Sequence, residues 1–197
     1  MMRVDKLLSN MGYGTRKQIK KSVKEGEVLV NGQPIKDPGT KVDSKKDVVI
    51  FAGEEVIYRE FIYLMLNKSK GYVSSTDDPQ YPTILELIDP YYYNFEPYPV
   101  GRLDVDTTGL LVITNDGMLT HQLTNPKKGV VKWYEALIEG EVTEKEVKIF
   151  KEGVSIPSEG YIAKPAELEI IESGSTSFIR VGISEGKYHQ VKHMFRE

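Results

Sequence analysis

Short apolar runs of strand length, separated by loops of a few residues, dominate the chain from residue 62 onward, and this pattern constrains the fold most. Four helical patterns interrupt them, near 82–89, 117–125, 143–152 and 187–196. No run reaches the ~18 apolar residues that a membrane helix needs. The chain has no cysteine, which excludes a disulfide scaffold and thiolate zinc sites. The pattern predicts an α+β protein with a mixed, mostly antiparallel sheet.

The first 24 residues differ in charge from the rest. The whole chain has a formal net charge of −3, which by itself argues against a nucleic-acid partner. Residues 1–24, however, hold seven Lys or Arg side chains and one carboxylate, a net charge of +6. Such asymmetry indicates a basic module joined to a different domain.

Two helices and two strands are predicted within this N-terminal region. Apolar side chains at i, i+3, i+4 and i+7 predict a short helix, and Thr15 is a suitable N-cap for a second helix over 16–25. On that second helix the cations fall within an arc of roughly 140°. They are Arg16, Lys17, Lys20, Lys21 and Lys24. Strands at 28–30 and 47–51 follow, the first ending in an Asn-Gly turn.

The segment TRKQIKKSVKEGEVLVNGQPI resembles the S4-type RNA-binding module. The resemblance implies an S4 (α-L) domain over residues 1–57, followed by a linker at 58–61. Phosphate contact would then use the basic side chains for affinity, with little sequence readout. The RNA-binding residues so implied are Arg3, Arg16, Lys17, Lys20, Lys21 and Lys24. A solvated charged helix on a small α+β domain is the alternative.

Residues 101–117, GRLDVDTTGLLVITNDG, carry the most chemical information. Positions 110–113 read as a buried strand and 115–117 as a tight turn. In front of the strand lies a loop that holds an arginine, two carboxylates and two hydroxyls. Such a group suits a polar active site. For an arbitrary sequence, a turn that Asp and Thr side chains stabilise by hydrogen bonds would be the favoured interpretation.

This run closely resembles the signature of the pseudouridine synthases of the RsuA/RluB group. Similar segments are YLMLNKSKGYVSSTDDPQYPTILELID, KWYEALIEG, KPAELEII and SEGKYHQVKHMF. The resemblance implies a catalytic domain over 62–197. Within the group, Y-H-Q-V-K is similar to the type that acts on small-subunit (16S) rRNA. A synthase acting on 23S rRNA, a non-catalytic RNA-binding or ribosome-assembly protein on this fold, and a two-carboxylate hydrolase remain alternatives.

The resemblance assigns roles to four residues. Asp104 becomes the catalytic aspartate, with Asp106 supporting its loop. Arg102 would fill the gap that a flipped nucleotide leaves, since reaction at C1′ and C5 requires the uridine outside its stack. Tyr134 would hold the target base, whereas its neighbour Trp133 points the other way along a strand. Lys192 matches the basic residue that pairs with the aspartate and keeps it ionised.

The C-terminal pattern predicts a helix over 187–196 with a cationic face and an apolar face. His189, Lys192, His193 and Arg196 share the first face, and Val191, Met194 and Phe195 share the second. The two histidines have the i, i+4 spacing of a zinc site, but Gln follows the first one and no third ligand is evident. We therefore expect no metal and no cofactor.

The remaining expectations concern context. The partner would be 16S rRNA or a small-subunit ribosomal particle, with no membrane association. A cytoplasmic monomer is expected, since no signal peptide and no long exposed apolar stripe is evident. In the family that the chain resembles, more strands normally follow the last motif, so the C-terminal end is expected to be truncated.

Overall fold

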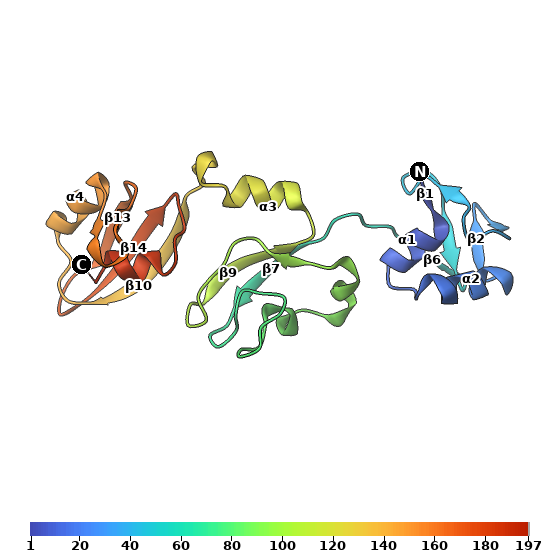
Figure 1. Cartoon of the computed structure of the whole chain (residues 1–197), viewed down its shortest axis with the longest axis horizontal. Helices are drawn as coiled ribbons and strands as arrows, with labels where there is room; N and C mark the ends of the chain where they lie inside the picture. The colour runs from blue at the N-terminus through green and yellow to red at the C-terminus, as the bar shows by residue number, and fades with distance from the viewer. Residues whose placement is uncertain (197) are drawn as a thin grey trace. The chain divides into compact units, whose positions relative to one another are not determined.

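The computed structural model describes residues 1–196 (Figure 1). The chain forms two compact units, Met1–Gly117 and Met118–Glu197. Each unit is described by itself.

The first unit begins with the two predicted helices. They are α1 (Val4–Asn10) and α2 (Arg16–Lys24). Thr15 caps α2: its hydroxyl accepts from the backbone N–H of Gln18, whose side chain accepts from the N–H of Thr15. This capping box satisfies two N–H groups that the helix leaves without partners. The apolar residues of both helices are buried, as their spacing predicts.

A small antiparallel sheet packs with these helices. Its strand order is β3-β2-β5-β6, from Gln33–Pro34, Val28–Val30, Val49–Phe51 and Glu54–Glu55. Asn31 and Gly32 connect β2 to β3, both with positive φ (50° and 78°), as a two-residue hairpin turn requires. A second pair, β1 (Met2–Arg3) and β4 (Lys41–Val42), is also antiparallel. The predicted strand and turn are confirmed.

The core of this helix pair continues into the segment that follows it in the first unit. Ile62 and Phe95 are buried in the same cluster as the residues of α1 and α2. At Gly12, where φ is +80°, an added Cβ would clash with the side-chain amide of Asn94. Glycine therefore permits both the backbone turn after α1 and this close approach.

The signature segment lies in a second antiparallel sheet of the first unit. The strand order is β7-β9-β8, from Tyr63–Lys68, Gly109–Thr114 and Tyr98–Pro99. Leu111 and Ile113 of β9 are buried with Ile84, whereas Leu110 is 68% exposed. The prediction of a buried strand at 110–113 is confirmed for the strand and for the burial of Leu111 and Ile113, but not for Leu110. Successive side chains point to opposite faces of a strand, and only one face of β9 is covered in this unit.

Two helices are shorter than predicted. The pattern at 82–89 forms only a 3₁₀ turn, η1 (Ile84–Leu87), and a second one, η2 (Pro90–Phe95), follows. Pro90 favours an extended residue before it, so a continuous helix cannot pass Asp89. The pattern at 187–196 forms only α5 (Gln190–Met194), because buried hydrogen bonds hold the preceding residues in a loop.

The second unit is built on one three-stranded sheet. Its order is β10-β14-β13, from Lys132–Glu139, Thr176–Ile183 and Glu167–Glu172, and all pairs are antiparallel. The helix α4 (Glu144–Glu152) contributes Phe150 to its core, and α5 contributes Met194. The remaining elements are α3 (Gly117–Thr124), which begins at the end of the first unit, η3 (Pro126–Lys128), β11 (Ser155–Ile156), η4 (Pro157–Glu159) and β12 (Tyr161–Ile162).

The α+β class is confirmed, and the predicted sheet is present as antiparallel ladders. Among residues 1–196, parallel pairing is limited to two isolated bridges, Val73 with Thr83 and Gly140 with Thr176. None of the described helices is long and apolar enough to cross a membrane.

Candidate active site

The loop that precedes β9 is anchored to the core of its unit by Leu103. This side chain packs against the cluster of Ile84, Leu111 and Ile113. Its backbone is held by one hydroxyl, since Leu103 N–H donates to Ser74 Oγ (3.0 Å) and Ser74 Oγ contacts Leu103 O at 2.8 Å. Leu103 and Asp104 are both half-buried, whereas Arg102 is exposed. The loop is therefore anchored through Leu103, and Arg102 beside it is accessible.

Lys68, the last residue of β7, is buried and binds the same loop through hydrogen bonds. Its side chain is fully buried. The ammonium group donates to three backbone carbonyls, those of Ser69 (3.0 Å), Val105 (3.4 Å) and Thr107 (2.9 Å). Because the last two carbonyls flank Asp106, one cation links the two sides of the carboxylate-bearing turn.

The charge of Lys68 acts on the same turn. Burial lowers the pKa of the Lys68 ammonium, while the negative charges of Asp106 and Asp104 oppose this shift. Lys68 is not predicted from the sequence, because a lysine beside a turn is normally solvated. Its place at the end of an apolar strand was the available signal.

The turn after β7 adds a further contact to the loop. Gly71, with φ of +91°, donates its N–H to the carbonyl of Val105 (2.8 Å). Thr107 N–H donates to the carbonyl of Asp104 (3.0 Å), which closes the loop as a tight turn. The segment containing Lys68, Gly71 and Ser74 thus holds the backbone on both sides of Asp104. These hydrogen bonds fix the backbone position of Asp104 within the loop.

Tyr134 and Lys192 lie in the second unit. Tyr134 is on β10, opposite Val181 of β14, and packs against the core of its sheet. Trp133 is on the other face of β10 and is 45% exposed, as strand alternation predicts. Lys192 is on α5 and is half-buried. The structure therefore brings Arg102, Asp104 and Lys68 together in one unit and carries Tyr134 and Lys192 in the other.

The predicted cationic face at the C-terminal end is only partly correct. His189 lies before α5, and the His193 side chain is 14% exposed, with Nε2 3.6 Å from a carboxylate oxygen of Glu159. Val191, Met194 and Phe195 do pack into the core, as predicted. Because the helix begins three residues later than expected, His189 does not share the helical spacing of Lys192.

All five predicted cations of α2 are exposed. Between them, Ile19 and Val23 are buried, so the helix packs through one face and presents Arg16, Lys17, Lys20, Lys21 and Lys24 on the other. Lys21 lies 3.6 Å from Glu25, and Arg3 is paired more closely still. It forms a two-point ion pair with Asp5, Nε to Oδ1 at 3.0 Å and a terminal nitrogen to Oδ2 at 2.8 Å. Its charge is therefore largely balanced within the fold.

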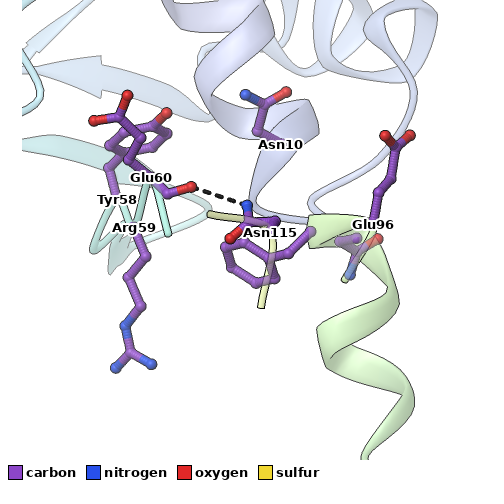
Figure 2. Close-up of a pocket in the computed structure, with 8 residues that line it drawn as sticks. Asn10, Tyr58, Arg59, Glu60, Glu96 and Asn115 are labelled. Carbon is purple, nitrogen blue, oxygen red and sulfur yellow. Dashed lines mark hydrogen bonds between the residues drawn. The ribbon is translucent and has the colours of Figure 1, made fainter. Parts of the chain in front are cut away.

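A separate polar pocket lies where the chain passes from the helix pair to β7 (Figure 2). Asn115 organises it: its amide donates to the carbonyl of Glu60 (3.0 Å), the dashed line in Figure 2, and its oxygen accepts from Ile62 N–H (3.0 Å). The side chains of Asn10, Tyr58 and Glu96 also line the pocket. The loop around Asp104 contributes no residue to the lining of this pocket. The two hydrogen bonds of Asn115 instead fix the backbone of Glu60 and Ile62, in the segment that leads to β7.

Among residues 1–196, no three His, Asp or Glu side chains are grouped so that they could hold a metal ion. The i, i+4 histidines instead stack, with ring centroids 6.3 Å apart.

Known proteins are similar to this chain in both its N-terminal and its C-terminal parts. Residues 62–197 match the RNA pseudouridylate synthase family, and residues 2–49 match the S4 domain. An uncharacterised RNA pseudouridine synthase of Bacillus subtilis is 48% identical over 98% of this chain and 81% of its own length. The ribosomal small subunit pseudouridine synthase A of Haemophilus influenzae is 39% identical over 98% of this chain and 82% of its own.

A solved structure agrees with these sequence relatives. The crystal structure of a pseudouridylate synthase, 36% identical, covers 100% of this chain and 83% of its own, with a TM-score of 0.63. The family match covers more than half of the chain, and the sequence relatives align with both segments. The chain therefore belongs to the RNA pseudouridylate synthase family, isomerases that act on RNA, and carries an S4 RNA-binding domain at its N-terminus.

Proposed function

We propose that this chain converts one uridine of small-subunit (16S) rRNA to pseudouridine, with Asp104 as the catalytic residue. The relatives named small subunit synthase support this substrate, since they are 36–39% identical over 98% of the chain. The observation that carries the proposal is the position of Asp104, half-buried in a turn that Lys68, Gly71 and Ser74 hold by their hydrogen bonds. A reaction that needs one carboxylate at a fixed place gains most from such preorganisation.

The isomerisation is balanced within the substrate. The bond from N1 of uracil to C1′ of ribose breaks, the base turns, and C5 forms the new bond to C1′. The proton on C5 leaves to solvent and N1 gains one. The carboxylate either attacks covalently or assists formation of a glycal-type intermediate, and both routes require it ionised.

The substrate-binding roles follow the same proposal. Arg102 is exposed beside Asp104 and is suited to fill the space of the uridine once it has left its stack. Tyr134 offers an aromatic ring for the flipped base, and Lys192 offers a positive charge for the nucleotide. Phosphate binding by the S4 domain uses the exposed cations of α2, with a smaller contribution from Arg3, whose charge Asp5 balances.

The test is tritium release from [5-³H]uridine-labelled 16S rRNA by Asp104→Asn, with Asp77→Asn as the matched control. Asp77 lies in the same unit, outside the loop before β9, and is exposed. We expect loss of activity for Asp104→Asn, retained activity for the control, and equal thermal stability. Activity of Asp104→Asn close to wild type would overturn the assignment.

Three substrates separate the remaining alternatives: naked 16S rRNA, a partly assembled small-subunit particle, and 23S rRNA. Tritium release from 23S rRNA alone would replace the 16S assignment. RNA binding without any tritium release would favour a non-catalytic RNA-binding protein, and free uracil among the products would indicate a hydrolase.

The domain limits are also part of the proposal: an S4 domain over 1–57, a linker at 58–61 and a catalytic domain over 62–197. The two compact units meet elsewhere, at Gly117. The proposed domain limits therefore follow the similarity to known families and not the compact units of the structure. We further propose that the protein acts as a cytoplasmic monomer. Light scattering during gel filtration tests the monomer, and cell fractionation tests the location.

A further inference from the structure

Immediately before α5, the chain presents an exposed aromatic pair. The ring of Tyr188 stacks on the ring of His189, with centroids 3.8 Å apart and planes inclined by 20°. Tyr188 is nevertheless 71% exposed, so only one face of its ring is covered. A large ring in this position does not serve a hydrophobic core.

A buried polar network holds the pair in place. Glu185, which is 8% exposed, accepts hydrogen bonds from Lys164 N–H (2.9 Å) and from the side-chain amide of Gln190 (2.7 Å). The oxygen of Gln190 accepts in turn from the N–H of Lys187 (2.9 Å). Buried polar groups that are satisfied in this way specify one conformation of the loop.

The backbone of His189 is strained. Its φ is +47°, in the left-handed region that residues other than glycine seldom adopt. Such strain persists only where the surroundings enforce it, and it concentrates at binding sites. Here the enforced conformation brings the imidazole under the Tyr188 ring.

Three cations lie in the sequence around the pair: residues 186–196 contain Lys187, Lys192 and Arg196. The nearby carboxylates are engaged, since Glu185 is buried and hydrogen-bonded and Glu159 lies 3.6 Å from His193. The ammonium of Lys187 lies 3.2 Å from the ring centroid of Tyr161, so it is fixed close to the loop. A supported aromatic ring among cations is the combination that single-stranded RNA binds, by base stacking and phosphate attraction.

We propose that the Tyr188–His189 pair is a stacking platform for an RNA nucleobase, a contact additional to those made by Tyr134 and Lys192. This inference rests on the proposed function, because it takes the same RNA as its ligand. The exposed face of Tyr188 receives the base, and His189 supports the ring from the other side.

A fluorescent reporter tests the contact directly. Trp133 is the only tryptophan, so Trp133→Phe with Tyr188→Trp gives a protein with one indole at the platform. Stacking of a base on that indole quenches its emission when a 16S rRNA transcript is added. The matched control combines Trp133→Phe with Tyr81→Trp, because Tyr81 is 47% exposed but follows two aspartates, Asp77 and Asp78. We expect quenching at position 188 and little at position 81.

Affinity provides the second measurement. Tyr188→Ala is expected to raise the Kd for the transcript roughly tenfold, the usual effect of losing one base–aromatic stack, and to raise KM more than it lowers kcat. Tyr188→Phe keeps the ring and is expected to recover most of the affinity. A recovery of this kind separates stacking from a hydrogen bond of the hydroxyl.

The outcomes distinguish this inference from the proposed function. Unquenched emission at position 188, together with an unchanged Kd for Tyr188→Ala, overturns the platform even if the wild type releases tritium normally. Quenching and weakened binding uphold the platform even if no rRNA is modified, in which case the proposed function fails. Loss of affinity in Tyr188→Phe equal to that in Tyr188→Ala also overturns stacking.

Discussion

Replacing Lys68 by Met removes the cation beneath the turn of Asp104 while keeping a long unbranched side chain. The two shorter hydrogen bonds of Lys68, to the carbonyls of Ser69 (3.0 Å) and Thr107 (2.9 Å), are lost. The carbonyl of Val105 keeps its bond from Gly71 N–H (2.8 Å). Each bond from a charged donor contributes about 1.5–3 kcal/mol, and Met offsets part of the loss because it buries no charge. We expect a net loss of about 2–3 kcal/mol in the free energy of unfolding.

In Lys68→Met, we expect the loss of enzymatic activity to be larger than the loss of stability. A displacement of the Asp104 turn by about 1 Å can lower the rate about 100-fold, so kcat in the tritium-release assay should fall by roughly 10- to 100-fold. Thermal melts should show a decrease of roughly 5–10 °C. The matched control is Lys70→Met, since Lys70 is exposed two residues further on. If Lys68→Met melts and turns over like this control, the reasoning about Lys68 is refuted.

Two further predictions concern the N-terminal module. Replacing Arg16, Lys17 and Lys20 together by Gln should weaken rRNA binding, lower the slope of log Kd against log salt by about 2–3, and change kcat little; a salt-insensitive complex in the wild type would contradict this. The hydrogen bonds from Arg3 hold the pKa of Asp5 below its usual value. Because this carboxyl binds its proton more weakly in the folded state, the ion pair stabilises the fold at neutral pH, and the stability is lost as pH falls below ~4 through the lowered pKa. The free energy of unfolding, measured in urea between pH 6 and pH 2.5, should therefore fall more steeply with decreasing pH in wild type than in Asp5→Asn. Parallel pH dependences of the two proteins would exclude the role of the ion pair.

The comparison of sequence with structure is most informative at the loop before β9. From the sequence, Asp104 is predicted to be the catalytic residue because a long motif surrounds it, and the strand that follows is predicted too. The sequence could not identify Lys68, whose burial depends on carbonyls 37 and 39 residues away in the chain. No periodicity reports a contact of that separation.

The C-terminal helix is a second case in which contacts distant in the chain override the local pattern. Spacing alone favours a helix over 187–196, and the local residues permit one. The buried bonds between Glu185, Gln190 and the backbone of Lys187 and Lys164 start the helix at Gln190 instead. The exposed stack of Tyr188 on His189 is a consequence of that tertiary network.

By itself, the sequence determined the features that depend on neighbours in the chain. These include the helix pair with Thr15 as an N-cap, the Asn-Gly turn, the basic face of α2 and the polar loop that contains Asp104. Hydrophobic periodicity, capping and turn preferences act over a few residues, so they can be read directly. Only the tertiary structure decided that Lys68 is buried under the turn, that Leu110 of β9 is exposed and that His189 supports Tyr188. The reason is that burial and buried hydrogen bonds depend on segments brought together from distant parts of the chain.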